Sequence, residues 1–134
     1  MWFKKEVIGS KKYETLIGGA SGFEMDTRNG ASQTLSLYMA STRGGNAYSP
    51  FEFNNWYMVT MVNNGTHELY YINGILTKTI EKKNMPNSNY YIGAWNTPTQ
   101  QNFKGNMSDF RIYCTALSAE DILSLYNNSA YIDN

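Results

Sequence analysis

The stretch that decides the fold is residues 69–76, which read LYYINGIL. An apolar run meets Asn73-Gly74, and an apolar run resumes immediately after it. Asn and Gly tolerate the positive φ angles of a two-residue hairpin turn, so this pattern predicts two antiparallel strands. A similar turn, NNGT at residues 63–66, precedes the first of these strands. We therefore expect a three-stranded meander with strands near residues 56–62, 67–73 and 75–81.

Further β-like runs flank this meander and are separated by turn signals. TLSLYMA at residues 34–40 alternates apolar and polar side chains, which is typical of a strand with one buried face. Similar runs are ETLIGG (14–19), GFEMDT (22–27), YYIGAW (90–95) and FKGNMSDFRIYCTAL (103–117), the last of which we expect to contain a long strand. Helical spacing appears only in SAEDILSLYNN (118–128), where Ser118 is the expected N-cap and Asp121 completes a capping-box variant. The sequence predicts an all-β fold, an antiparallel two-sheet β-sandwich or jelly roll with one short C-terminal helix.

The length of 134 residues suits one domain over residues 1–134. A domain of this size buries roughly two-thirds of its unfolded surface, so it needs no disulfide or metal to fold. Apolar positions on the predicted strands form the expected core: Trp56, Val59, Leu69, Ile72, Ile92, Phe110 and Ile112.

Charge is sparse and balanced, with 11 basic and 11 acidic residues. A surface that binds nucleic acid needs a basic stripe or patch, so this composition argues against nucleic acid as a partner. The longest apolar run is far shorter than the ~20 residues of a membrane-spanning helix, so we expect no membrane insertion. Cys114 is the single cysteine and cannot form an intrachain disulfide.

Four stretches carry a family resemblance, in the order NNWYMVTMV (54–62), HELYYINGILTKTI (67–80), YYIGAW (90–95) and FKGNMSDFRIYCTALSAEDILSLYN (103–127). Together they resemble the laminin-G-like branch of the concanavalin A-like lectin/glucanase superfamily. The matching positions are Trp56, Tyr71 to Gly74, Ile92-Gly93, Gly105 to Tyr113 and Leu117 to Tyr126. The resemblance implies a jelly roll, and WFKK at residues 2–5 resembles an earlier strand of that fold. Because the superfamily includes lectins, adhesion domains, glycosidases and phage structural domains, function has to be argued from a site.

Glycosidase activity is the enzymatic hypothesis to weigh. Retaining glycosidases need two carboxylates about 5 Å apart, one as nucleophile and the other as acid/base. The family's form is Glu-x-Asp followed shortly by another Glu, and this sequence departs from it. Glu24 and Asp26 share a strand face, but no acidic residue follows before Glu52, so a polar strand face explains them better. His67, the only histidine, has no motif of a catalytic nucleophile around it. We therefore expect that the protein is not an enzyme.

Residues 94–102, AWNTPTQQN, give the sharpest binding signal. Tyr and Trp rings offer flat contact area for a sugar ring, and the amides beside Trp95 supply hydrogen bonds. Aromatic residues of the long loop over residues 41–55 could complete a rim. The predicted carbohydrate site comprises Trp95, Asn96, Thr97, Gln100, Asn102, Tyr48 and Phe51. In the alternative, Trp95 packs inward at the edge of the core, and the 41–55 loop folds over the sheet as a lid.

Calcium is a second hypothesis, which the resemblance suggests. Domains of this kind often hold Ca²⁺ in rim loops through carboxylates, Asn side chains and carbonyls. The candidate ligands are Asp26, Asn29 and Asp109. The alternative for Asp109 is a structural ion pair with Arg111. We expect no other cofactor.

The sequence therefore favours a non-catalytic recognition domain that binds a carbohydrate or a cell-surface ligand. Its expected location is extracellular, on a cell surface or on a virion. The alternative is a structural domain of a phage or surface protein, such as a tail, a fibre or a capsid decoration, with no small-molecule ligand.

The resemblance begins in mid-pattern at WFKK, so we expect a domain that is incomplete at its N-terminus and part of a larger protein. A missing strand would leave an open sheet edge near FRIYCTAL, residues 110–117, with unpaired N–H and C=O groups. Three arrangements would cover that edge: self-association, a strand from a neighbouring domain or subunit, and the tail NSAYIDN at residues 128–134.

Overall fold

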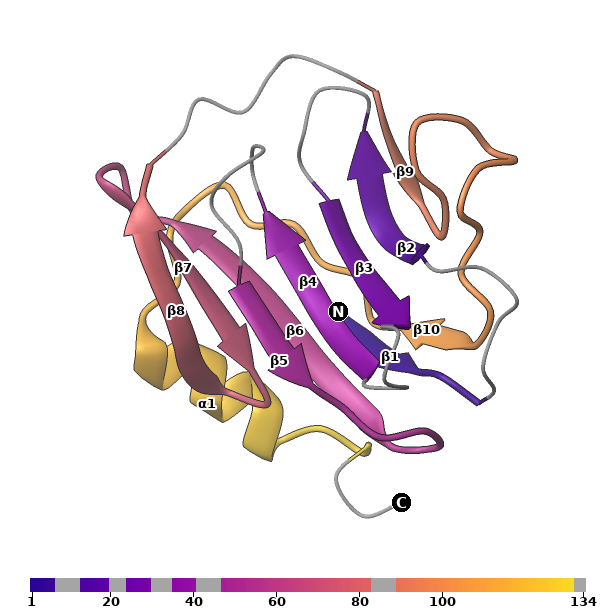
Figure 1. Ribbon diagram of the computed structural model, residues 1–134. Coiled ribbons are helices and arrows are strands. Elements are labelled where there is room, and N and C mark those ends of the chain that lie inside the picture. Colours follow the sequence, from indigo (N-terminus) through magenta and orange to yellow (C-terminus); the bar gives the residue numbers. More distant parts are fainter. Residues whose placement is uncertain (7–12, 20–23, 30–34, 41–46, 83–88, 132–134) are drawn as a thin grey trace.

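The computed structural model describes residues 1–6, 13–19, 24–29, 35–40, 47–82 and 89–131. These residues form two five-stranded antiparallel sheets that face each other, with one helix on the outer side of the first sheet (Figure 1). The first sheet has the strand order β10-β1-β6-β7-β8, and the second has the order β5-β4-β3-β2-β9. The predicted two-sheet β-sandwich is confirmed.

The elements have the following bounds. The first sheet contains β1 (Trp2–Lys4), β6 (Trp56–Asn63), β7 (His67–Ile72), β8 (Ile75–Glu81) and β10 (Asn106–Ser108). The second sheet contains β2 (Tyr13–Gly19), β3 (Glu24–Asn29), β4 (Leu35–Ala40), β5 (Ala47–Pro50) and β9 (Tyr90–Ile92). The helix is α1 (Ala119–Asn127).

The predicted meander is present as β6, β7 and β8, within one residue of the expected bounds. Asn73 and Gly74 have φ angles of 51° and 78°, as a tight hairpin turn between β7 and β8 requires. The Asn73 side-chain oxygen also accepts a hydrogen bond of 2.9 Å from the backbone N–H of Met58. Asn73 therefore closes one hairpin and ties its turn to the neighbouring strand.

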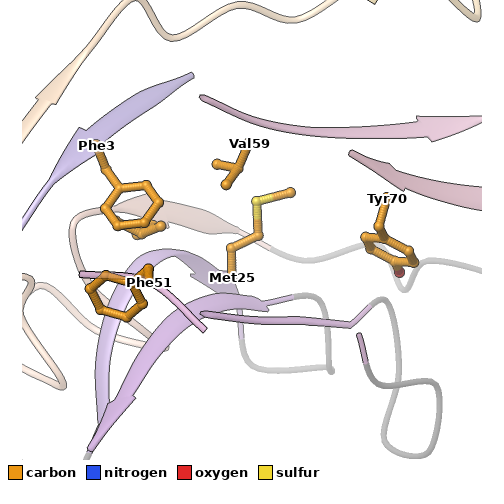
Figure 2. Packing of buried hydrophobic residues seen from close by; sticks show 6 residues of the cluster. Phe3, Met25, Phe51, Val59 and Tyr70 are labelled. Atoms are coloured by element: carbon orange, nitrogen blue, oxygen red, sulfur yellow. The ribbon is translucent and has the colours of Figure 1, made fainter. Parts of the chain in front are cut away.

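The main core lies between the two sheets and is built from both. Figure 2 shows Phe3, Met25, Phe51, Val59 and Tyr70 gathered in this space. The rings of Phe3 and Phe51 meet edge to face, with centroids 5.6 Å apart. Of the residues predicted to form the core, Val59 is buried, whereas Trp56, Leu69 and Ile72 are half-buried and pack against the two clusters. Aromatic burial of this kind supplies most of the stabilisation of a sandwich.

A second cluster lies between the first sheet and α1. It contains Trp2, Met58, Val62, Tyr71 and Ile122. The rings of Trp2 and Tyr126 stack with centroids 5.6 Å apart, so the helix covers the outer face of β1. Ser118 is the N-cap and forms the expected reciprocal capping box with Asp121.

The expected long strand within residues 103–117 is wrong. Only Asn106–Ser108 is a strand, and the chain turns away at Asp109, which has a φ angle of 51°. The carboxylate of Asp109 accepts two hydrogen bonds from Arg111, at 2.6 and 2.8 Å, which is the predicted structural ion pair. Because residues beyond Asp109 leave the sheet, Phe110 and Ile112 are 39% and 83% exposed instead of buried.

Ile92 was also expected in the core, and it is 53% exposed. It is the last residue of β9, an edge strand of only three residues. Gly93 follows it with a φ angle of 75°, and the chain turns into the loop over residues 94–102. The apolar content of YYI predicted the strand correctly. Ile92 pairs with Ile17 and so belongs to the inner face, but it lies at the outer edge of the sheet, where no described strand covers it.

A buried ion pair joins the residue that follows β1 to β2 and to the segment before β10. Lys5 Nζ and Glu14 Oε2 are 2.5 Å apart, and both side chains are only 4% exposed. The same carboxylate oxygen accepts a 2.9 Å hydrogen bond from the backbone N–H of Lys104. Lys5 also lies over the ring of Phe103, 5.5 Å from its centroid. The pair therefore fixes one end of the sandwich through three separate parts of the chain.

Candidate functional site

The outer face of the second sheet carries a polar cluster on neighbouring strands. Met25 of β3 enters the core, so Glu24 and Asp26 belong to the opposite face of the strand. On β2, Thr15 pairs with Asp26 and Gly18 pairs with Glu24. The register shifts between Thr15 and Ile17, and the bulge brings Leu16 into the core without moving the polar residues off the outer face.

Arg28 organises the acidic side chains of this face. Its guanidinium donates two hydrogen bonds to Asp26, at 2.8 and 3.1 Å. It donates a third, of 3.0 Å, to Glu24. The guanidinium also lies over the ring of Tyr13, 5.0 Å from its centroid. One cation thus forms a bidentate pair with Asp26, also binds the carboxylate of Glu24, and lies on an aromatic support.

Asp26 is the deepest member of this cluster, since only 1% of it is exposed. Burial raises the pKa of Asp26 to about 7, although the hydrogen bonds and charge of Arg28 act in the opposite direction. The nearby carboxylate of Glu24 also raises this pKa, because two like charges share one guanidinium. The face therefore contains a carboxyl group that titrates near neutral pH.

Trp95 lies on the same face, beside the polar cluster. A Cβ atom at Gly18 would be 2.8 Å from Trp95 Cδ1 and 2.9 Å from Thr15 Cγ2. The indole ring therefore rests on the backbone of β2, at a position that has no side chain of its own. Trp95 is half-buried, so neither the fully inward packing nor a fully exposed ring describes it.

The loop over residues 94–102 is compact and attached to β2. Gly93 O accepts a hydrogen bond of 2.9 Å from the N–H of Phe103, which brings the two ends of the loop together. Gln101 O accepts a 2.7 Å hydrogen bond from the N–H of Thr15, and Thr15 Oγ1 donates a 3.1 Å hydrogen bond to Gln101 Oε1. A closed loop of this kind holds its side chains on a fixed support.

Four predicted site residues belong to this loop and surround Trp95. Asn96 and Thr97 are half-buried, whereas Gln100 and Asn102 are exposed. The backbone carbonyl of Gln100 accepts a 3.0 Å hydrogen bond from the backbone N–H of Trp95, and Asn102 Nδ2 donates a 2.7 Å hydrogen bond to the carbonyl of Pro98. The structure thus brings these four together with Trp95.

The other half of the predicted rim lies elsewhere. Residues 47–50 of the expected 41–55 loop form β5, at the opposite edge of the sheet from β9. Phe51 is only 7% exposed and packs on Phe3, so its place in the rim was wrong: it is a core residue. Tyr48 lies in β5, and its side chain is outside the part of the chain that the structure describes.

The three candidate calcium ligands are not brought into one cluster. Asp26 is in β3 and pairs with Arg28, whereas Asp109 follows β10 of the other sheet and pairs with Arg111. Asn29 ends β3, and its side chain lies outside the described residues. Within the described ranges no three His, Cys, Asp or Glu side chains form a group that could hold a metal ion. Calcium binding stays a prediction.

Sequence reasoning missed Thr15, Arg28 and Gln101 as members of the site. The spacing of Glu24, Asp26 and Arg28 already indicated one strand face, and Gly18-Gly19 within a strand was a signal for close approach of another group. Trp95 is brought to Gly18 by the pairing of β2 with β9, which joins residues about 75 positions apart in the sequence, such as Ile17 and Ile92.

Several solved structures resemble this chain in fold. An S-layer domain-containing protein from Clostridium thermocellum is 21% identical, has a TM-score of 0.51, and aligns over 90% of this chain and 66% of its own. The receptor binding domain of a botulinum neurotoxin of mosaic serotype C/D is 22% identical with a TM-score of 0.58, and 94% of this chain covers 34% of that domain. Botulinum neurotoxin type C, in a structure described by its interaction with two ganglioside molecules, is 21% identical with a TM-score of 0.55 over the same shares. At these identities the likeness concerns the fold, and the chain spans about a third of the length of the toxin structures.

A comparison with curated protein sequences gives no significant match. The described residues contain no helix with the length and apolar character needed to cross a membrane. A family model matches residues 1–123 of the chain. It represents a laminin-G-like family, and its description is the concanavalin A-like lectin/glucanases superfamily. With nearly the whole chain matched, and with two antiparallel sheets and a short C-terminal helix in place, this chain belongs to the concanavalin A-like lectin/glucanases superfamily.

Proposed function

We propose that this domain binds an oligosaccharide without catalysing a reaction, on the outer face of the second sheet. The observation that carries the proposal is the position of Trp95, whose ring rests on Gly18 beside the cluster of Thr15, Asp26 and Arg28. An aromatic ring and fixed hydrogen-bonding groups on one surface are the two features that recognition of a sugar needs.

The chemistry of the face suits a neutral or polar glycan. The indole ring offers an apolar surface to the C–H face of a sugar ring, and the Gln101 and Asn102 amides beside it can exchange hydrogen bonds with hydroxyl groups. Arg28 and Glu24 are partly exposed and add a charged donor and a charged acceptor, which form the stronger hydrogen bonds, whereas Asp26 is buried and holds Arg28 in place. Because these groups are fixed by one another and by the sheet, little ordering is needed on binding.

The width of the face favours an oligosaccharide over a single sugar. β5 and β9 are the edge strands of the second sheet, and four strand spacings separate them. At ~4.8 Å per spacing the face is ~19 Å wide. Trp95 lies at the β9 edge, so a chain of sugars that starts on this ring would extend across β2 and β3.

A binding role is favoured over glycoside hydrolysis by the partners of the two carboxylates. A retaining glycosidase needs one free nucleophile and one acid/base. Here Asp26 is held by two hydrogen bonds from Arg28, and Glu24 by a third. Arg28 cannot exchange protons at neutral pH, so it cannot take the place of a second catalytic carboxyl group.

The structural neighbours support a role outside the cell or on its surface. One neighbour is an S-layer domain-containing protein, and another is the toxin structure described with two ganglioside molecules. A third is the binding domain of botulinum neurotoxin DC in complex with rat synaptotagmin II, which makes a surface protein the second class of ligand to test.

A glycan array, run with and without Ca²⁺, tests the proposal. The wild-type chain should bind at least one class of oligosaccharide, and Trp95→Ala should abolish that binding while the melting temperature shows a folded protein. Tyr113→Ala is the matched control, because Tyr113 is 44% exposed but lies in the segment beyond β10. Equal binding by wild type and Trp95→Ala would refute the site, and a requirement for Ca²⁺ would support the calcium prediction.

A further inference from the structure

The last two residues of the loop over residues 94–102 have amide side chains, and each amide is held through one of its two polar atoms. Thr15 Oγ1 donates a 3.1 Å hydrogen bond to Gln101 Oε1. Asn102 Nδ2 donates a 2.7 Å hydrogen bond to the carbonyl of Pro98. Gln101 is therefore held by its amide oxygen, whereas Asn102 is held by its amide nitrogen.

The other polar atoms of these two amides have opposite hydrogen-bonding character. Gln101 Nε2 can only donate, and Asn102 Oδ1 can only accept. Within the part of the chain that the structure describes, neither atom has a hydrogen-bond partner. Gln101 is half-buried and Asn102 is exposed, so a ligand on the surface can reach both residues. The end of the loop thus offers one donor next to one acceptor.

The backbone of Gln101 is held in a conformation that residues with a side chain rarely adopt. Its φ angle is 50°, in the left-handed region. Its carbonyl accepts a 2.7 Å hydrogen bond from the N–H of Thr15, which is buried, and Asn102 forms a β-bridge with the same residue. Such conformations persist where the surrounding structure determines them, and they are frequent where proteins hold ligands. Both amides are therefore positioned by β2 before a ligand arrives.

The two amides lie close to Trp95. The N–H of Trp95 donates a 3.0 Å hydrogen bond to the carbonyl of Gln100, the residue before Gln101. A Cβ atom at Gly18 would be 2.8 Å from Trp95 Cδ1 and 2.9 Å from Thr15 Cγ2, so the residue that holds Gln101 also lies beside the indole ring. The donor, the acceptor and the ring therefore belong to one part of the surface.

We propose that the bound oligosaccharide contains N-acetylated amino sugars, an inference that rests on the glycan-binding role proposed above. An acetamido group has a C=O that only accepts and an N–H that only donates, so it complements Gln101 Nε2 and Asn102 Oδ1. Its methyl group adds apolar surface that can pack on the indole ring of Trp95.

Other substituents of sugars match the two amides less well. The ammonium group of a deacetylated amino sugar can only donate, which leaves Gln101 Nε2 without an acceptor. A carboxylate can only accept, which leaves Asn102 Oδ1 without a donor. A single hydroxyl oxygen would have to serve both amides, and it brings no methyl group. Because polar groups that lose water without gaining a partner cost free energy, the site should favour the acetamido group.

Three tetrasaccharides with the same backbone test this preference: chitotetraose, its fully deacetylated form and cellotetraose. Their affinities for the full chain are measured by isothermal titration calorimetry. Chitotetraose should bind about tenfold more tightly than either of the others, which is the effect of one or two hydrogen bonds at a partly exposed site.

The failure of this inference can be distinguished from the failure of the glycan-binding role. Equal or tighter binding of cellotetraose would overturn the preference for acetamido groups and leave the glycan site in place. The same holds if the chain binds on a glycan array only oligosaccharides that lack an acetamido group. If the chain bound no oligosaccharide at all, both proposals would be refuted.

Gln101→Glu tests the donor directly. The variant has nearly the same shape and keeps an oxygen for Thr15, but it replaces the amide donor with an acceptor. It should therefore bind chitotetraose and cellotetraose with equal affinity. Thr99→Glu is the matched control, because it adds the same charge to an exposed residue of the same loop and should keep the preference. A purely structural effect would weaken both tetrasaccharides alike, so the ratio of the affinities is decisive. A preference that persists in Gln101→Glu would contradict the assignment of the donor.

Discussion

The indole ring of Trp95 rests on the backbone of Gly18, with Cδ1 only 2.8 Å from the place where a Cβ atom would stand. Because Gly18 has no side chain, the ring has room to lie beside the polar cluster of the second sheet. The contact joins residues on β2 and on the loop after β9, and it connects the fold directly to the proposed binding function.

Gly18→Val should displace Trp95 and weaken oligosaccharide binding. The new side chain would collide with the indole ring and with Thr15 Cγ2, which lies 2.9 Å from the same place. Overpacking of this kind costs ~1–3 kcal/mol of stability, so the protein should still fold. Tryptophan fluorescence and a glycan-binding titration would report the two effects. Unchanged binding in the folded variant would show that the position of the ring does not matter.

The Lys5–Glu14 ion pair should be sensitive to the loss of one partner. Glu14→Gln leaves a buried ammonium group without its counter-charge, and we expect a loss of ~3–5 kcal/mol in the free energy of unfolding. Replacing both residues with apolar ones, as Lys5→Met with Glu14→Leu, should recover part of that loss. Urea denaturation of the three proteins measures these differences.

A neighbouring ion pair provides the control for that experiment. Lys4 and Glu6 approach to 3.9 Å, and their side chains are 28% and 52% exposed. Exposed pairs contribute ~0–1 kcal/mol, so Glu6→Gln should change stability little. Similar losses for Glu6→Gln and Glu14→Gln would mean that burial of the second pair has no special effect.

Stability should fall as the pH rises from about 4 to 7, because of Asp26. Its pKa in the folded protein is about 7, whereas an Asp in an unfolded chain has a pKa of ~3.9. Between these values the folded protein holds a proton that the unfolded chain has released, so raising the pH lowers the free energy of unfolding. Asp26→Asn should flatten this dependence in urea titrations across the range. A slope that stays the same in Asp26→Asn would assign it to another group.

Removal of the N-cap of α1 should cause a modest loss of stability. The Asp121 carboxylate accepts from the Ser118 N–H at 2.9 Å, and the Ser118 hydroxyl accepts from the Asp121 N–H at 3.1 Å. Loss of an N-cap costs ~1 kcal/mol, so Ser118→Ala should lower stability by about that amount. Glu120→Ala changes an exposed residue in the same turn without touching the cap, and it should have a smaller effect on the thermal midpoint. If the two variants were equally stable, the cap would contribute nothing.

The sheet pattern could be predicted from the sequence wherever turns and alternation are local. Asn73-Gly74 and NNGT define the meander to within a residue, and Ser118 with Asp121 defines the helix start. The stretch from Phe110 to Leu117 was misjudged because its apolar content is typical of a strand. Whether such a segment pairs depends on a neighbouring strand, and the chain leaves the sheet at Asp109.

The candidate site could be predicted only in part, for the same reason. Trp95 and the amides near it are adjacent in the sequence, and their shared location followed from that. Phe51 was placed on a rim because it stands in a turn-rich segment, but it packs between the sheets. The neighbours of Trp95 on β2 and β3 come from strand pairing over long distances in the sequence, which composition and spacing do not reveal.

An NMR titration with an oligosaccharide that the chain binds on a glycan array tests the position of the proposed glycan site most directly. This position predicts that the largest shifts occur at the Trp95 indole N–H and at the amides of Thr15, Gly18 and Arg28, on one face of the second sheet. Saturable shifts confined to the first sheet or to residues 109–117 would contradict it, as would the absence of any bound oligosaccharide.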